Sequence, residues 1–358
     1  MKRYLHGIHV AGHKSTAQMS AVKLPLPDSV VIPMAMHIGA PAKPVVKVGD
    51  YVKTGQLIGE PGGFVSAPIY ASVSGTVKKI GEMLGSNGRM MQTVEIESDG
   101  LDARWEGIQP PKLETMQDFL DAVRASGLVG LGGAGFPTVV KLTVKNLDQI
   151  KCVIINGAEC EPYITSDTRA MIDYSFDVIA GCRLLQKFLK VPRIVFGIED
   201  NKPECIDLLC KKTKDDSAIE VKPLPSVYGT GAELILIEKC LGREVPHGGL
   251  PADAGAIVMN VTSVSTLGKY LATGMPVVER TITVDGDACA KPQNIVVPVG
   301  TAYQDIIDFA GVKGELGKVV AGGAMMGPAV ENLSYPTTKT TSGLIFLSKA
   351  AAEPAPVN

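Results

Sequence analysis

The sequence contains no long hydrophobic run. Its apolar segments are strand-sized, as in Cys152-Val153-Ile154-Ile155, whereas a membrane-spanning helix needs about 18 or more apolar residues in succession. We therefore expect no spanning helix, and any association with a membrane would be peripheral. The opening MKRYLHGIHV has no apolar segment of signal-peptide length, so we expect a cytoplasmic protein.

A basic excess and paired cysteines are also missing. Lys and Arg number 35 against 37 Asp and Glu, for a net charge of -2, so general nucleic-acid binding is disfavoured. The seven cysteines include no Cys-x-x-Cys pair, which argues against a disulfide framework and a self-contained metal or cluster site. Gly7 and Gly12 disfavour the helix on which His9 and His13 would share a metal. We expect no metal site.

The first half of the chain begins with a unit of short strands. Residues 30 to 80 alternate apolar and polar positions between turn signals, as in PVVKVGDYVKTGQLIGE and YASVSGTVKKIGE. This pattern resembles the biotinyl/lipoyl-type barrel-sandwich fold, whose carriers attach their cofactor to a hairpin lysine. No lysine occurs between Lys53 and Lys78, so we predict a docking module rather than a swinging arm.

An α/β domain and a smaller module are predicted to follow. Residues 115 to 127 have a helical pattern, and the strand-like segments KCVIING and RIVFGIE flank the helical SFDVIAGCRLLQKFLK; this alternation is typical of a mainly parallel sheet. From about residue 275, two strands and a helix resemble a β-grasp module. We predict these parts: an N-terminal segment with barrel-sandwich module at 1–110, a nucleotide-binding α/β domain at 111–272, a β-grasp module at 273–349 and a linker at 350–358.

The most informative motif is SGLVGLGGAGFPTVVKL, residues 126 to 142. Its glycines let backbone N–H groups approach a ligand, and a helix N-terminus after them favours phosphate. The candidate phosphate-binding residues are Gly130, Gly132, Gly133, Gly135 and Lys141. A tight structural turn is the alternative for such a motif alone. A helix, rather than a strand, precedes the loop, so it is not a Rossmann fingerprint.

A second motif, INGAECEPYITSDTRAM, directly follows the strand KCVII. Asn156, Glu159 and Glu161 are therefore expected at the carboxyl end of a strand, where open α/β sheets place ligands. A carboxamide and two carboxylates can hydrogen-bond the edges of a flavin or a nicotinamide amide. A solvated acidic loop with Asn156 as a turn residue is the alternative.

Together these motifs resemble the flavin subunit of respiratory complex I and, more closely, the RnfC subunit of the Rnf electron-transport complex. In that superfamily a G-x-G-G-A-G-F-P-T-x-x-K loop binds FMN and NADH, and an N-x-x-E-x-E-P loop borders the flavin; Ala158 replaces an Asp of complex I, which suits the Rnf relative. By this resemblance Phe136 would stack near the nicotinamide or adenine. Further candidate cofactor-binding residues are Gly231 and Glu233 in YGTGAELILIEKCLGREVP, and Thr262 and Ser263 in place of a phosphate contact.

The resemblance implies a flavoprotein that passes electrons between NAD(H) and non-covalent FMN by positioning, without a catalytic acid or base. Its implied partners are the other Rnf subunits, including the ferredoxin-like RnfB subunit and the membrane subunits, with ferredoxin reached indirectly. The chain would be peripheral on the inner face of the cell membrane, and other subunits would move Na+ or H+ across that membrane. The family's two cysteine runs for [4Fe-4S] clusters do not occur in these 358 residues. The alternatives are an Rnf-like carrier that serves proline reductase and a non-catalytic scaffold.

Overall fold

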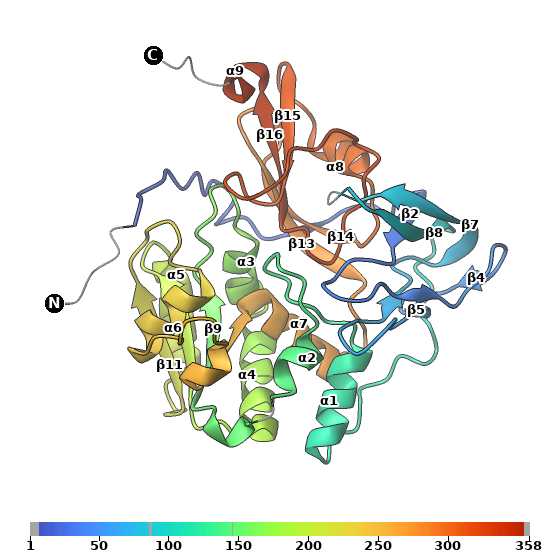
Figure 1. The fold of residues 1–358 in the computed structure, drawn as a ribbon. Helices are drawn as coiled ribbons and strands as arrows, with labels where there is room; N and C mark the ends of the chain where they lie inside the picture. Colours follow the sequence, from blue (N-terminus) through green and yellow to red (C-terminus); the bar gives the residue numbers. More distant parts are fainter. Residues whose placement is uncertain (1–6, 86–87, 145, 354–358) are drawn as a thin grey trace.

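The structure is a computed structural model that describes residues 7–85, 88–144 and 146–353. Its described strands form four sheets, arranged as a small β unit, an α/β unit and a second β-rich unit (Figure 1). The predicted mixed α/β class with a barrel-sandwich module is confirmed.

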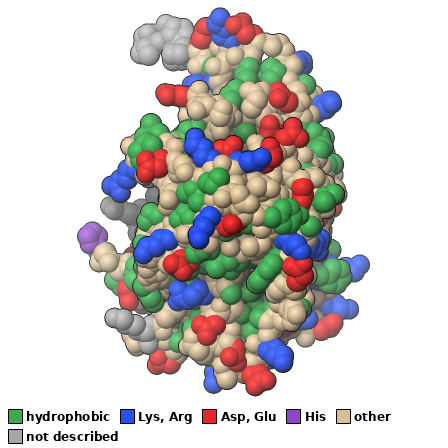
Figure 2. All heavy atoms as spheres, turned by 90° about the vertical axis from the view of Figure 1, so that its right-hand side faces the viewer, with side chains coloured by type: hydrophobic (Ala, Val, Ile, Leu, Met, Phe, Trp, Pro, Cys, Tyr) green, Lys and Arg blue, Asp and Glu red, His purple; other side chains and the backbone are tan. Residues whose placement is uncertain are grey.

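The barrel-sandwich unit consists of two small antiparallel sheets around one core. The first has the order β2 (Ser29–Pro33), β8 (Met90–Ser98), β7 (Gly75–Leu84), β4 (Tyr51–Val52); the second has the order β3 (Lys43–Pro44), β5 (Leu57–Glu60), β6 (Ile69–Tyr70). Val94 and Ile96 are buried whereas Glu97 is exposed, as expected for a strand with one face toward the core. Figure 2 shows charged side chains of both signs interspersed on this side of the molecule.

The central sheet is fully parallel, as the sequence predicts. Its order is β11 (Ile219–Leu224), β10 (Ile194–Glu199), β9 (Cys152–Gly157), β12 (Ala256–Asn260). The strands β9, β10 and β12 read as largely apolar, buried runs because helices cover both faces of such a sheet. Asn156 and Asn260 are register partners at the carboxyl ends of β9 and β12, so these two strands end at one edge.

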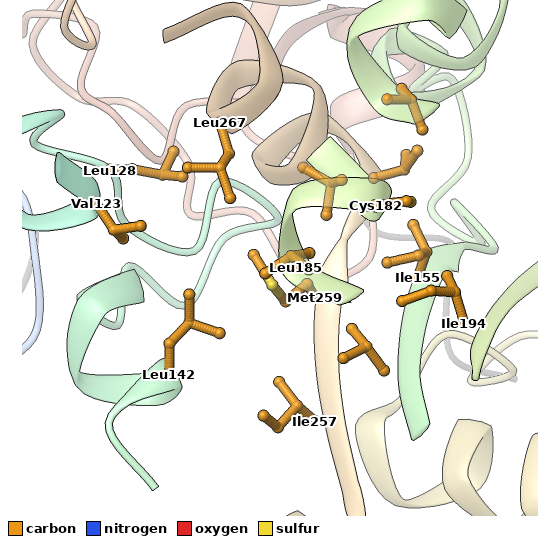
Figure 3. Close-up of a cluster of buried hydrophobic side chains, with 14 of the residues drawn as sticks. Val123, Leu128, Leu142, Ile155, Cys182, Leu185, Ile194, Ile257, Met259 and Leu267 are labelled. Atoms are coloured by element: carbon orange, nitrogen blue, oxygen red, sulfur yellow. The ribbon is translucent and has the colours of Figure 1, made fainter. Parts of the chain in front are cut away.

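Helices pack on both faces of the central sheet. One face meets α1 (Met116–Ala125), α2 (Thr138–Leu142), α3 (Ser166–Asp173), α4 (Ser175–Leu189), α5 (Pro203–Thr213) and α7 (Val261–Thr273); the other meets α6 (Glu233–Leu241) and the 3-10 turn η2 (Pro251–Ala254). A further 3-10 turn, η1, spans Leu147–Gln149. Figure 3 shows Leu128, which precedes the glycine loop, beside Leu267 of α7 in the larger core. The loop therefore extends from a rigid base.

The third unit is a five-stranded sheet with a helix packed on it. Its order is β1 (Val22–Lys23), β14 (Gln293–Pro298), β13 (Glu279–Asp285), β16 (Gly343–Ser348), β15 (Leu316–Ala321), and α8 (Tyr303–Ala310) supplies apolar residues to its core. β1 joins this sheet by pairing Val22 with Ile295. The strand β1 therefore lies with the third unit rather than with the barrel-sandwich unit, and a strand of two residues carries too little alternation for the sequence to show it.

One terminal prediction is wrong in part. Residues 350–352 of the predicted linker belong to the short helix α9, which spans Lys349–Ala352. Ser348 caps it by accepting a hydrogen bond from Ala351 N at 3.3 Å, and a run of alanines favours a helix. The last five residues of the predicted linker lie outside the described residues.

Candidate functional site

The glycine loop is a closed turn with an exposed tip. Gly130 N donates to the Phe136 carbonyl at 2.9 Å and Gly135 N donates to the Gly130 carbonyl at 3.1 Å, which closes the loop at its base. Gly132, Gly133 and Ala134 form the exposed tip. Within residues 7–85, 88–144 and 146–353, no group accepts a hydrogen bond from the N–H of any of these three. The tip therefore presents three consecutive free donors, as an anion-binding loop requires.

The loop lies against the N-terminus of α7. Leu131 N donates to Ser263 Oγ at 2.9 Å, and a side chain on Gly132 would begin 3.1 Å from Asn260 Nδ2. Asn260 Oδ1 accepts from Ser263 N at 3.1 Å and so caps the helix. Only glycine at position 132 allows this approach without displacing Asn260. The partial positive charge of the helix N-terminus adds to the donors of the loop tip.

Asn156 connects the acidic loop with the third motif. Its Nδ2 donates to the Gly231 carbonyl at 2.9 Å, and its Oδ1 accepts from Ala158 N at 3.1 Å. A Cβ on Gly231 would lie 3.3 Å from the Ala158 Cβ, so the two backbones pack closely. The structure thus brings together Asn156 and Gly231, two residues that the sequence analysis had selected from separate motifs.

The two carboxylates of the acidic loop have different environments. The Glu159 carboxylate is buried and accepts from Asp167 N at 2.6 Å and from Thr168 at the start of α3; burial raises its pKa. The Glu161 carboxylate accepts from Tyr228 Oη at 2.8 Å and from Met325 N at 2.9 Å. The Glu159 carboxylate therefore binds the first turn of α3, and the Glu161 carboxylate joins the acidic loop to the third unit.

Lys141 and Glu233 form an ion pair. Lys141 Nζ lies 3.1 Å from Glu233 Oε1 and donates to the Val258 carbonyl at 3.0 Å, with the two side chains 34% and 41% exposed. Both remain accessible to solvent, on helices that begin near the same sheet edge. Phe136 is half-buried at the base of the glycine loop.

The two predicted hydroxyl contacts are already occupied by protein groups. Thr262 Oγ1 donates to Asp167 Oδ1 at 2.6 Å, and Ser263 Oγ accepts the hydrogen bond from Leu131 N described above. Asn260 Nδ2 also donates to Asp167, at 2.8 Å. These hydroxyls therefore fix the surroundings of the glycine loop rather than stand free beside it.

The sequence analysis missed two residues that support the loop. Asn260 follows an apolar strand and precedes a helix, which is an N-cap signal that the sequence does carry. Arg280 Nη2 donates to the Leu131 carbonyl at 3.1 Å from β13. Arg280 is buried, and burial lowers its pKa to about 10. Nothing in its local sequence separates it from an ordinary strand residue.

Comparison with known proteins identifies the family. Residues 123–269 match the Nuo51 FMN-binding domain and residues 2–101 match the RnfC barrel sandwich hybrid domain. The RnfC subunit of the proton-translocating ferredoxin:NAD(+) oxidoreductase complex of Clostridium ljungdahlii is 43% identical over 98% of this chain and 77% of its own length. The chain belongs to the RnfC family.

Other RnfC relatives agree with this assignment. The corresponding subunit of the Na(+)-translocating complex of Acetobacterium woodii is 43% identical over 97% of this chain and 81% of its own length. The corresponding subunit of the ion-translocating complex of Pseudomonas aeruginosa is 38% identical over 96% of this chain and 45% of its own. Thus the resemblance predicted from the two motifs is confirmed.

The fold also occurs outside the Rnf family. An NAD+-reducing [NiFe]-hydrogenase in its air-oxidized state contains a chain that matches with a TM-score of 0.54 and 22% identity, covering 65% of this chain and 47% of that one. This likeness concerns the fold alone. Among the described residues, no helix combines the length and apolar character needed to cross a membrane.

Proposed function

We propose that this chain binds FMN and NAD(H) and passes electrons between them as the RnfC subunit of an ion-translocating ferredoxin:NAD+ oxidoreductase. The observation that carries the proposal is the row of free N–H donors at Gly132, Gly133 and Ala134. They lie beside the N-terminus of α7, which suits the FMN phosphate. Lys141 stands on the helix that follows the loop and supplies a full positive charge.

The acidic loop would hold the rings. Asn156 fixes its start, and Glu161 at its far end would contact NAD(H), with Phe136 as the neighbouring aromatic surface. The Glu159 carboxylate is committed to the start of α3, so we assign it no ring contact. FMN, when bound, supplies the conversion of a two-electron hydride into single electrons. The protein's part is to place nicotinamide and flavin face to face.

The wider assignment follows the names of the relatives, which are subunits of ion-translocating complexes. We propose that the chain docks at the cytoplasmic face of the membrane with the membrane subunits and the ferredoxin-like RnfB subunit, and that electrons continue through [4Fe-4S] clusters. We also propose unit boundaries near residues 110, 272 and 349. The barrel-sandwich unit would serve docking, since residues 54 to 77 contain no lysine.

A titration of the purified chain with FMN tests the cofactor assignment. We expect stoichiometric binding of FMN with quenching of its fluorescence. A chain that is folded by circular dichroism yet takes up no FMN would contradict the proposal and favour the scaffold alternative.

A further inference from the structure

Lys14, from the N-terminal segment, binds the backbone of the acidic loop. Its Nζ donates to the carbonyl oxygens of Glu159 at 2.8 Å, Glu161 at 2.8 Å and Ile164 at 2.5 Å. One ammonium group thus uses all three of its donors on a single loop. Burial of its ammonium group lowers the pKa of Lys14.

Lys202 binds the backbone carbonyl of Ala158, the residue before Glu159. Its Nζ donates to the Ala158 carbonyl at 2.6 Å and lies 3.3 Å from Glu199 Oε2. Lys202 and Glu199 are both buried. Two lysines that lie far apart in the sequence therefore bind successive carbonyls, those of residues 158 and 159, as well as two carbonyls further along the loop.

The segment that carries Lys14 crosses the acidic loop as a strap, which we define as residues 7–17. Ile8 forms a β-bridge with Tyr228, Tyr163 N donates to the Gly12 carbonyl at 2.8 Å, and the His13 ring stacks on Tyr163 with centroids 4.8 Å apart. Figure 1 shows this N-terminal segment, in blue, passing from the α/β unit toward the third unit. After Lys14, Ser15 Oγ donates to Asp285 Oδ2 at 2.7 Å, so the strap has an anchor on each side of Lys14.

These contacts fix the direction of two peptide groups. In a planar trans peptide the N–H points opposite to the C=O. Binding of the Ala158 and Glu159 carbonyls by lysines therefore turns the N–H groups of Glu159 and Cys160 the other way. No acceptor for either N–H occurs among the residues that the structure describes. Glu159 has a φ of 51°, the left-handed conformation that lets successive N–H groups converge in a nest.

We propose that Lys14 and Lys202 are positioning residues of the flavin site, which orient the Glu159 and Cys160 N–H groups toward the electron-rich edge of the bound ring. This inference rests on the proposed function. Fixed donors favour the state in which negative charge develops nearby. The two lysines therefore raise the midpoint potential of the bound flavin, in addition to holding the loop.

The test compares the variant Lys14→Met with a matched control, Lys23→Met. Lys23 belongs to the same N-terminal region, but its side chain is 60% exposed and its Nζ lies 3.5 Å from Asp102. Two properties are measured: hydrogen exchange at Tyr163 and Thr165 in the flavin-free protein, whose N–H groups are hydrogen-bonded to Gly12 O and Thr283 Oγ1, and the midpoint potential of the FMN-loaded protein. We expect Lys14→Met to accelerate the exchange at least tenfold and to lower the potential, and Lys23→Met to change neither.

Each outcome decides one part of the inference. Unchanged exchange in Lys14→Met would overturn the positioning of the loop, and faster exchange at an unchanged potential would overturn the orientation of donors toward the ring. If the wild-type chain takes up no FMN, the proposed function fails, while the exchange measurement still decides whether Lys14 holds the loop. If Lys14→Met does not fold, reductive methylation of the wild type replaces it: we expect Lys14 to react much more slowly than Lys23, and equal rates would overturn the inference.

Discussion

Lys141 and Glu233 form an ion pair at 3.1 Å between the helix that follows the glycine loop and the first residue of α6. The pair joins two motifs that lie 92 residues apart in the sequence. Because both side chains are more than a third exposed, their mutual attraction contributes little, on the order of 0 to 1 kcal/mol. A phosphate dianion near the loop therefore competes readily with Glu233 for the ammonium group.

The first prediction concerns this ammonium group. Lys141→Met should weaken FMN binding by about 10- to 150-fold, in line with the loss of one charge-assisted contact of about 1.5–3 kcal/mol. Riboflavin, which has the same ring but no phosphate, should bind equally well to the variant and the wild type. Fluorescence titration with both ligands measures the difference. An equal loss for FMN and riboflavin would show that Lys141 does not act on the phosphate.

The second prediction concerns two glycines of the loop. Gly135 has a φ of 66°, and a Cβ there would lie 3.0 Å from Thr340 Cγ2, whereas the nearest atom to a Cβ on Gly130 is 3.6 Å away. Gly135→Ala should therefore cost about 1–2 kcal/mol of unfolding free energy and weaken FMN binding. Gly130→Ala is the matched control and should change the stability by less than about 0.5 kcal/mol. Urea unfolding measures both, and equal stabilities would refute the loop geometry.

The third prediction concerns Glu161. Glu161→Gln keeps the size of the side chain but removes its negative charge and one of the two carboxylate oxygens that accept from Tyr228 and Met325. We expect the KM for NADH to rise several-fold while FMN remains bound. Steady-state oxidation of NADH with an artificial electron acceptor gives the KM. Tyr228→Phe removes one of the same hydrogen bonds and should shift the KM in the same direction; an unchanged KM in both would exclude Glu161 from NADH binding.

The fourth prediction concerns the buried Lys339. Its ammonium donates to the carbonyls of Pro68 and Gly127, both at 2.7 Å, and so joins all three units. Burial lowers its pKa from 10.5 to about 7. Between these two pKa values Lys339 is protonated in the unfolded chain but not in the folded protein. The contribution of Lys339 to stability should therefore rise from pH 7 toward pH 10 and stay at its lowest below pH 7.

Comparison with Lys339→Met isolates that contribution. Urea unfolding of the wild type and the variant at pH 7 and pH 9 measures the free energy of unfolding of each. From pH 7 to pH 9 this free energy should rise in the wild type relative to the variant, by up to about 1.4 kcal/mol per pH unit. A constant difference between the two proteins across this range would mean that Lys339 keeps its ordinary pKa in the folded state.

The sequence predicted the parts of the site that lie within single motifs. The glycine loop and the acidic loop are each one continuous stretch of the sequence. The strand before Asn156 places this residue at the carboxyl end of β9, and in a parallel sheet this end lies at the same edge as the end of β12, where α7 begins. Asn260 carried a usable N-cap signal that the sequence analysis passed over. These features depend on local pattern, which a sequence displays directly.

The remaining contacts could not be predicted because they depend on tertiary packing. Lys14, Arg280 and Lys339 come from other units and bind main-chain carbonyls, which every residue has, so no complementary side chain marks the partner. The same holds for Glu159, whose carboxylate caps α3 eight residues later instead of contacting a ring. The carboxylate and the backbone of one residue thus have separate roles, which residue type alone does not reveal.

An absorbance spectrum of the wild-type chain loaded with FMN, recorded before and after anaerobic addition of NADH, tests the proposed electron transfer most directly. We expect a bound flavin whose oxidised-state absorbance is bleached by NADH within the mixing time. A flavin that stays bound and oxidised in the presence of excess NADH would contradict the central claim that this chain passes electrons between nicotinamide and FMN.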